Sequence, residues 1–455
     1  MATICLVIAS IIFYAYYNWS YSLILISSII INYVFHILLF RLDKSRLLCA
    51  ISGVVFNLSV LCYFKYYNFF VDNINQIFST GFMVRNIILP LGISFFTFQQ
   101  VSFLIDTYKK STPLYNFWNY ALFVSFFPQL IAGPIVLHHE MIPQYENKEK
   151  RKVNYSSAYK GIQYFVLGLA KKVLIADTFG RAADWGYANV LELNSLSTAV
   201  LILSFSIQIY FDFSGYCDMA IGLGKLFNFD IPMNFCSPYQ AHSIKEFWRK
   251  WHITLTRFFT SYLYIPLGGN RKGKLRAYIN IMIIFTFSGL WHGADWSFVV
   301  WGMMHGTAVV LNGVFEKYWV KVPALLKWFG TFLFLSFLWV FFRAAHIRQA
   351  LSVFKRLLSG GSGLAREMAE VFGGSGLKLM LSQLSFDDKI YDLWANIGTV
   401  LWFVAVMTII AKAKDVQNMV ADNKTGTAYV LGLSCLFIIS LVSLSDIAQF
   451  LYFNF

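Results

Sequence analysis

Charge is scarce in this chain. Only 13% of its 455 residues are Asp, Glu, Lys or Arg, whereas soluble domains carry about 25%. Hydrophobic residues make up 58% of the chain and aromatic residues 19%. A water-soluble globular domain cannot bury that much apolar surface, so the composition excludes this class and predicts a membrane protein.

Paired cysteine motifs are also missing. The chain has six cysteines, none in a Cys-x-x-Cys pair, and most lie in apolar runs, so ordinary buried thiols are expected and no metal site is indicated. The sequence lacks a Gly-x-Ser-x-Gly elbow, which argues against a serine acyl-enzyme. The N-terminus has neither a basic leader region nor a small-residue cleavage site, so it is interpreted as a retained first helix.

Long apolar runs are abundant. They cover residues 4–16, 22–40, 47–63, 87–105, 120–137, 161–175, 198–213, 279–290, 296–311, 328–342, 397–411 and 429–442. Many approach the roughly 20 residues that a spanning helix needs. The chain is therefore predicted to be a single all-α, polytopic membrane domain over residues 1–455, with about 10–13 transmembrane or partial helices. The short segments 213–226 and 279–290 fit broken or re-entrant helices beside a cavity.

The net charge of +14 does not require a nucleic-acid partner. The basic residues occupy short links between apolar runs, such as 41–46 and 148–152. Such links lie mostly in the cytoplasm, and we place the basic region 245–276 there too, with membrane lipids as neighbours. Between residues 343 and 396 the apolar pattern lapses, and two Gly-Gly-Ser-Gly pieces flank a helical stretch at 364–372. This insertion is interpreted as a surface loop with an amphipathic segment; a docking site for a partner protein is the alternative.

Polar residues interrupt the apolar pattern in the middle third. Asp212, Ser214 and Tyr216 lie at the end of one apolar run, beside Gly215, which permits a break or a close approach. A carboxylate at that depth should face protein or water rather than lipid. We expect these side chains to support a cavity; for Asp212 a buried structural role and a direct catalytic role are equally compatible with the pattern.

A basic, aromatic segment follows at residues 243–259. Ser243 and Glu246 form a capping-box signature, and apolar residues then recur at three- and four-residue steps, which predicts one interfacial amphipathic helix. Arg249 and Lys250 would face lipid headgroups. His252 lies at the margin of the apolar face, and the pattern alone favours a structural role for it. Arg271, in a Pro- and Gly-rich turn, would meet phosphates of lipids or of a cofactor such as coenzyme A.

His292 follows directly after the apolar run 279–290 and Trp291. An imidazole at membrane depth is costly unless it has a function, and His transfers protons well near neutral pH. Asp295, three residues later, would orient the ring only if the helix continued past Gly293. His305 lies further along the same block.

Five ordered motifs resemble the membrane-bound O-acyltransferase family, and within it the bacterial branch that includes alginate O-acetylase. They are Phe127-Pro128-Gln129-Leu130-Ile131-Ala132-Gly133-Pro134, Phe211-Asp212-Phe213-Ser214-Gly215-Tyr216, Glu246-Phe247-Trp248-Arg249-Lys250-Trp251-His252, Tyr264-Ile265-Pro266-Leu267-Gly268-Gly269-Asn270-Arg271 and Gly289-Leu290-Trp291-His292-Gly293. The resemblance extends from about Tyr14 to Phe455. Relatives usually begin with a further apolar helix, and the link 343–396 has no residues that match.

The resemblance implies a ring of membrane helices around a narrow tunnel in the bacterial cytoplasmic membrane. An acyl donor enters from the cytoplasm and a hydroxyl acceptor from the opposite side. His292 matches the invariant histidine of the family, and His252 matches a second important one. The acyl group in the polysaccharide branch is acetyl, passed directly or through a periplasmic partner acetyltransferase to an exported polymer. The donor, acetyl-CoA or another acyl thioester such as an acyl-carrier protein, is a substrate, and no bound cofactor is expected.

We therefore expect an O-acetyltransferase with His292 as general base; an acyl-His292 intermediate is the second choice. His252 would position or polarise the donor, and Arg249, Lys250 and Arg271 would contact its phosphates. One alternative is D-alanyl transfer from a carrier protein toward teichoic acid. The other is a transporter with an intramembrane His and Asp proton relay, which the absence of paired half-sequences disfavours.

Overall fold

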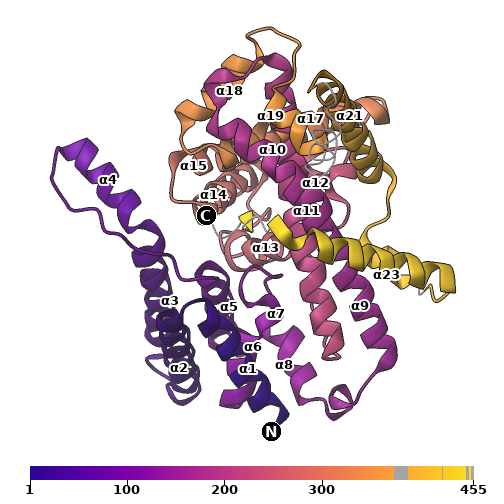
Figure 1. Cartoon of the computed structure of the whole chain (residues 1–455). Helices are drawn as coiled ribbons and strands as arrows, with labels where there is room; N and C mark the ends of the chain where they lie inside the picture. The colour runs from indigo at the N-terminus through magenta and orange to yellow at the C-terminus, as the bar shows by residue number, and fades with distance from the viewer. Residues whose placement is uncertain (374–387, 423, 447–449, 452–455) are drawn as a thin grey trace. The chain divides into compact units, whose positions relative to one another are not determined.

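The computed structural model describes residues 1–373, 388–422, 424–446 and 450–451 (Figure 1). Within these ranges every regular element is a helix and no strand occurs. Six helices are long and apolar enough to cross a membrane. They are Trp19–Arg41, Arg46–Phe78, Ser195–Leu226, Trp296–Val314, Ala324–Arg343 and Lys389–Lys412. Two shorter apolar helices, Ala2–Tyr17 and Thr427–Val442, accompany them. The predicted all-α, polytopic architecture is confirmed.

Several predicted runs form helices that are shorter than a full span. The run 87–105 yields α5 (Ile93–Tyr108), which begins after Gly92 in the left-handed region with φ of 71°. The run 120–137 yields α6 (Phe117–Ser125) and the single turn α7 (Phe127–Leu130), with Pro128 in that turn. Hydrophobicity alone therefore does not locate the helix ends, because Gly and Pro divide apolar sequence into shorter elements.

The chain forms two compact units, each assembled from separate segments. Unit 1 comprises Met1–Phe165, Cys217–Asn234 and Thr254–Leu267, and unit 2 comprises Val166–Tyr216, Phe235–Ile253 and Gly268–Phe455. Two helices, α9 (Tyr155–Ala170) and α11 (Ser195–Leu226), have residues in both units. That the whole chain is a single membrane domain remains a prediction.

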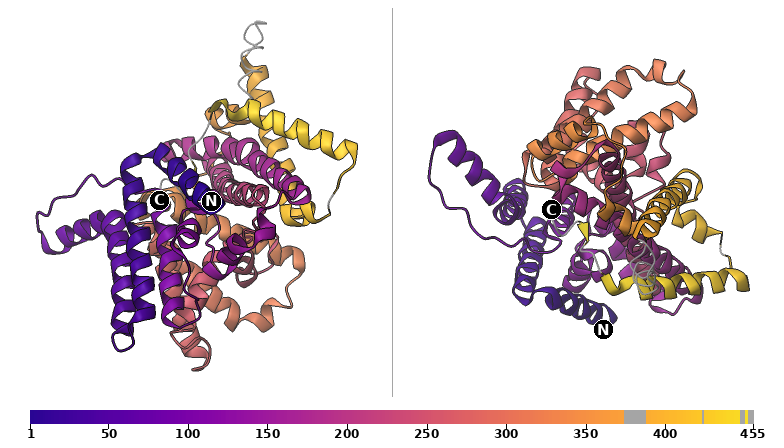
Figure 2. Two further views of the ribbon diagram at one scale, coloured as in Figure 1. Left: turned by 90° about the horizontal axis from the view of Figure 1, so that it is seen from below. Right: turned by 45° about the horizontal axis from the view of Figure 1, so that its top comes forward.

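Unit 1 contains the N-terminal helices. Besides α5 to α7, they are α1 (Ala2–Tyr17), α2 (Trp19–Arg41), α3 (Arg46–Leu61) continued by η1 (Cys62–Tyr66), α4 (Tyr67–Phe78), α8 (His138–Glu146) and η2 (Lys148–Arg151), with most of α13 (Ile253–Phe259) and η6 (Thr260–Tyr264). Figure 2 shows α2 and α3 side by side. Their buried amides pair: Asn57 Nδ2 donates to Asn32 Oδ1 across 2.6 Å, and Ser28 Oγ donates to Gln100 Oε1 of α5 across 3.0 Å. Such bonds join helices whose outer faces meet lipid.

Unit 2 contains the remaining helices. They are η3 (Lys171–Ala176), α10 (Asp177–Ala188), η4 (Val190–Glu192), η5 (Pro238–Gln240), α12 (Ile244–Lys250), α14 (Lys274–His292), α15 (Trp296–Val314), α16 (Glu316–Trp319), α17 (Ala324–Arg343), α18 (Ile347–Leu357), α19 (Arg366–Gly373), α21 (Asp388–Lys412), α22 (Val416–Ala421), α23 (Thr427–Val442) and η7 (Ser443–Asp446). The stretch predicted to be helical at 364–372 corresponds to α19, which packs against α10 and α21 (Figure 1).

Two glycines bring α14 and α15 into close contact. A Cβ atom on Gly289 would overlap the carbonyl oxygen of Phe298, and a Cβ on Gly302 would overlap that of Phe285. Neither position therefore accepts a side chain without moving a backbone. Small residues allow this approach of two helices, and it brings the end of α14, with His292, against the first half of α15.

Candidate active site

His252 lies at a break between two short helices. The predicted start is correct: the Ser243 side chain accepts the Glu246 N–H across 3.1 Å, and α12 begins at Ile244. The single helix predicted over 243–259 is wrong, because α12 ends at Lys250 and α13 begins at Ile253. His252 has φ of 45°, in the left-handed region that breaks a right-handed helix. This backbone turn gives the imidazole an orientation that a continuous helix would not.

His292 is the last residue of α14. Gly293 follows in extended conformation with φ of −157°, and its N–H still bonds the Gly289 carbonyl across 3.3 Å. The imidazole therefore stands at a helix end, where the backbone leaves the helix.

The two histidines meet in the interior of unit 2. Their ring centroids are 6.3 Å apart and the ring planes are inclined at 57°. His252 is completely buried, and His292 is 4% exposed. The structure thus brings together the two histidines that the sequence had singled out from separate motifs.

Aromatic side chains surround the histidine pair. The Phe213 ring lies 4.8 Å from His252, edge to face. The rings of Trp301 and Phe342 lie 5.3 Å and 5.2 Å from His292. All three are at most 2% exposed. A wall of this kind excludes bulk water from the histidine pair.

Burial sets the protonation state of His252. It lowers the pKa of His252 to about 3, because the charged ring would lose its solvation. The ring is therefore neutral at pH 7. A neutral imidazole carries one hydrogen-bond donor and one acceptor, so His252 can hold a polar substrate atom without adding charge.

A third histidine, His305, was noted in the sequence but was assigned no contacts there. Trp248 Nε1 donates to His305 Nδ1 across 3.3 Å, and the rings of His305 and Trp301 are 4.7 Å apart. Trp301 and His305 are four residues apart on α15, and both are fully buried. The i, i+4 spacing in Trp301-Gly302-Met303-Met304-His305 was the available signal, because it places both side chains on one helix face.

Asp212 has the bonding of a structural acid. Lys172 Nζ lies 2.6 Å from Asp212 Oδ1 and 2.7 Å from Asp177 Oδ1. The second oxygen of Asp212 accepts the Leu451 N–H across 3.0 Å. Ser214, two residues further along α11, is buried, and the Tyr216 ring lies 4.8 Å from that of Phe450. This ionic cluster fixes α11, the helix that carries Phe213.

Asp295 lies after the helix break. Because α14 ends at His292, the condition under which Asp295 would orient that ring is not met. Asp295 instead caps α15: its Oδ1 accepts the Ser297 N–H across 2.8 Å, and its Oδ2 lies 3.3 Å from His346 Nδ1. Its visible role is to start the helix that carries Trp301 and His305.

The three candidate donor-binding cations lie at the surface of unit 2. Arg249 and Arg271 are exposed. Lys250 is partly buried and forms an ion pair with Glu246 across 2.8 Å. Arg271 follows Gly268 and Gly269, whose φ values of 100° and 55° make the predicted turn. Exposure leaves these cations accessible to phosphates, but they lie outside the buried histidine pair.

Asp106, His138 and His139 of unit 1 lie close enough together to hold a metal ion. Their potential ligand atoms are within 4.8 Å of one another. Sequence reasoning had found no metal motif. His138 Nε2 lies 3.2 Å from Asp106 Oδ2, and its Nδ1 lies 3.3 Å from the Tyr115 hydroxyl. Hydrogen bonds thus already occupy both ring nitrogens, which is the arrangement of a structural Asp–His pair.

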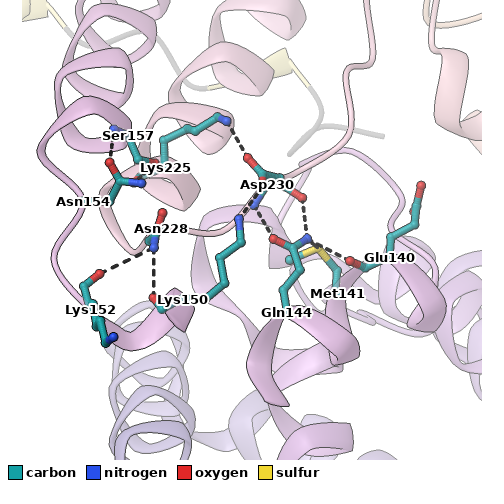
Figure 3. Close-up of polar contacts among 10 residues, drawn as sticks. All are labelled: Glu140, Met141, Gln144, Lys150, Lys152, Asn154, Ser157, Lys225, Asn228 and Asp230. Atoms are coloured by element: carbon teal, nitrogen blue, oxygen red, sulfur yellow. Dashed lines mark hydrogen bonds and ion pairs between the residues drawn. The ribbon is translucent and has the colours of Figure 1, made fainter. Parts of the chain in front are cut away.

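A second polar network in unit 1 surrounds Asp230 (Figure 3). Lys150 and Lys225 each place Nζ 2.5 Å from an Asp230 carboxylate oxygen. Gln144 accepts the Asp230 N–H across 2.8 Å, and Asn228 Nδ2 donates to the Lys150 carbonyl across 3.2 Å. These contacts attach the basic link 148–152 to the end of α11.

The fold defines a polytopic, all-α membrane protein with a buried pair of histidines in unit 2. The family model for MBOAT, the membrane-bound O-acyltransferase family, matches residues 11–347. The chain belongs to this family, so the predicted class of enzyme, an O-acyltransferase, is confirmed.

Two bacterial relatives resemble the chain over most of its length. The "Peptidoglycan O-acetyltransferase" of Helicobacter pylori is 39% identical over 99% of this chain and 91% of its own. The "Probable alginate O-acetylase AlgI" of Pseudomonas aeruginosa is 38% identical over 80% of this chain and 71% of its own. The "Teichoic acid D-alanyltransferase" of Streptococcus thermophilus is more distant, at 25% identity over 49% of this chain.

Proposed function

We propose that this protein transfers an acetyl group to a hydroxyl of an exported polysaccharide, and that the polysaccharide is a cell-wall glycan. The pairing of His252 and His292 in a dry aromatic interior carries the catalytic part of this proposal. The acceptor is inferred from relatives: the peptidoglycan enzyme aligns over 91% of its length and the alginate protein over 71%. A cell-wall acceptor requires the bacterial cytoplasmic membrane as the location.

His292 acts as the general base in the proposed reaction. The acceptor hydroxyl attacks the carbonyl carbon of the acyl thioester while its proton moves to the His292 imidazole. The carbon–sulfur bond then breaks, and the proton passes from His292 to the departing thiolate. His252, neutral at pH 7, positions the thioester next to the base.

Trp301 and His305 supply the hydrogen bonds that the developing oxyanion needs. Because His305 Nδ1 accepts from Trp248, the His305 proton is on Nε2. In the part of the chain that the structure describes, neither this nitrogen nor Trp301 Nε1 has a hydrogen-bond partner. A buried N–H donor without a partner is costly. The N–H groups of Trp301 and His305 are therefore suited to bind a substrate oxygen, and the Trp301 ring contacts His292.

The donor enters from the cytoplasm in this proposal. Acetyl-CoA, or another acyl thioester, would place its phosphates against the exposed Arg249 and Arg271 and the partly buried Lys250 of the basic segment. The proposal also includes a tunnel through the protein, in which donor and acceptor meet, and a periplasmic partner acetyltransferase that would pass the acetyl group on. Both the tunnel and the partner are inferred from the family resemblance.

D-alanyl transfer toward teichoic acid is less well supported, because relatives with that name share 25–26% identity over about half of the chain. A transporter is disfavoured by membership of an acyltransferase family. Turnover of a labelled acyl donor separates catalysis from transport, and labelled acetyl against labelled D-alanyl carrier protein separates the two cargoes.

The decisive experiment compares wild type with His292→Gln in membranes containing equal amounts of folded protein. Transfer of labelled acetyl to a cell-wall glycan should fall by about 100- to 10,000-fold, the usual contribution of a general base. Near-normal transfer by His292→Gln would remove His292 from the mechanism. Transfer to alginate but not to cell-wall glycan would overturn the acceptor and leave the chemistry intact.

A further inference from the structure

A groove is lined by residues of α15, α16 and α17. It lies within unit 2 and encloses about 740 Å³. Its walls include Met303, Met304 and Leu311 of α15, Phe334 of α17 and Trp319 of α16. The buried residues Trp301 and His305 lie on the neighbouring face of α15. The groove therefore does not include the histidine pair, but it is lined by the helix that carries Trp301 and His305.

The groove is lined by two helices of membrane-spanning length. Both α15 and α17 are long and apolar enough to span a membrane. The lining residues of α15 run from Val300 to Phe315, a distance of about 22 Å at 1.5 Å per residue. That length exceeds half of the roughly 30 Å hydrocarbon thickness, so the groove matches one extended acyl chain. Methionines in the wall adapt to a flexible chain.

One polar atom in the groove has an unusual environment. Thr331 is 3% exposed, and its hydroxyl has no hydrogen-bond partner among the described residues. Threonine in a helix commonly donates to the carbonyl four residues earlier, as Thr307 does to Met303 across 2.9 Å. The Thr331 hydroxyl is therefore available to a ligand, and it lies in the same groove as the Asn312 amide.

We propose that this groove binds one acyl chain of a membrane glycerophospholipid, with its ester carbonyl accepting a hydrogen bond from Thr331. The ester end would lie near Asn312 and Trp319, at the end of α15, and the chain would extend toward Val300. Tryptophans are typical of the membrane interface where ester groups lie. The lipid would brace α15, the helix that carries Trp301 and His305. This inference goes beyond the proposed acyl transfer and does not depend on it.

Gly330 allows the groove to be filled without disturbing the fold. It lines the groove, and a Cβ atom added there would meet no atom within 4 Å. The Gly330→Leu side chain should therefore occupy the space of the lipid chain. Gly432→Leu on α23 is the matched control, because a Cβ there also meets nothing within 4 Å. Comparable unfolding temperatures for the two variants establish that the fold is retained.

Binding is measured on the full-length protein in nanodiscs containing brominated phosphatidylglycerol, which quenches nearby tryptophan fluorescence. The part of the quenching that is lost in Trp319→Phe reports lipid bound in the groove, because Trp319 lines it. This component should vanish in Gly330→Leu and persist in Gly432→Leu. Thr331→Val keeps the shape but removes the hydroxyl, and it should weaken lipid retention about 3- to 10-fold, as loss of one hydrogen bond requires.

Three results would overturn the inference. Equal Trp319 quenching in Gly330→Leu and wild type would show that no chain occupies the groove. Displacement of the brominated lipid by a prenyl phosphate, but not by excess phospholipid, would assign the groove to a carrier lipid. Unchanged retention in Thr331→Val would remove the ester contact. None of these measurements uses acyl transfer, so a failed acetylation assay leaves the test intact.

Discussion

Trp248 donates its indole N–H to Nδ1 of His305 across 3.3 Å, from a short helix to a long one 57 positions further along the chain. This bond fixes the tautomer of a buried histidine, since a nitrogen that accepts cannot carry the proton. The His305 proton is thereby placed on Nε2, beside Trp301, whose ring also lies edge to face with His292.

The proposed oxyanion donors can be tested by removing one N–H and little else. Trp301→Phe keeps an aromatic ring in the wall but loses Nε1–H. Its kcat should fall by about 100- to 1,000-fold, as for loss of one oxyanion donor, while KM for the donor changes little. Trp328→Phe is the control, because that indole already donates to the Tyr239 carbonyl across 2.8 Å. A rise in KM at constant kcat would assign Trp301 to substrate binding instead.

The Lys172 cluster should matter for stability more than for chemistry. Lys172→Met leaves Asp212 and Asp177 without their shared cation, a loss of about 3–5 kcal/mol when the charges are buried. Thermal unfolding in detergent should therefore occur at a clearly lower temperature. Lys152→Met breaks an exposed pair with Glu149, 71–72% exposed, and should change the unfolding temperature little. Equal shifts in the two variants would contradict the structural role of the cluster.

The network around Asp230 predicts a pH dependence. Burial raises the pKa of the Asp230 carboxyl, but hydrogen bonds from Lys150 and Lys225 outweigh burial, and the net pKa is lowered. The resulting stabilisation is present above the unfolded-chain pKa of about 3.9 and is lost as the pH falls through the lower folded value. The difference in unfolding temperature between wild type and Asp230→Asn should hold at pH 5–8 and shrink below about pH 4. A difference that stayed constant at acid pH would show that the carboxylate charge is not involved.

The basic region should face the cytoplasm, where the donor is made. Single cysteines at Lys250 and Lys272, in a variant without the six native cysteines, are probed with an impermeant thiol reagent on intact cells. Both should stay unlabelled until the membrane is opened. Labelling from the periplasm would reverse the topology and exclude donor entry at this face.

Composition and motif order were sufficient to predict the helical membrane architecture and the two histidines. The apolar content dictates the membrane architecture, because no soluble fold buries so much hydrophobic surface. The break at His252 escaped prediction because the left-handed region is open to any residue at some cost, and no Gly or Pro marks it. The capping role of Asp295 was missed for a related reason: its spacing from His292 fits a continuous helix, which Gly293 ends.

The contact between Trp248 and His305 was beyond the reach of sequence patterns. It joins α12 to α15, and only the close approach at Gly289 and Gly302 fixes how α15 presents its face. Helix periodicity relates neighbours within one helix but not partners on two. The roles of Arg249, Lys250 and Arg271 depend on a substrate and stay predictions.

The left-handed backbone at His252 alters how substitutions there should be interpreted. With φ of 45°, the native histidine already carries a backbone strain of about 1 kcal/mol, and alanine would carry a similar strain. His252→Ala therefore keeps the backbone strain and removes only the imidazole. Asn tolerates this conformation, and Gly adopts it freely. A comparison of His252→Asn, His252→Gly and His252→Ala separates the geometry of the chain at this point from the proton chemistry of its side chain.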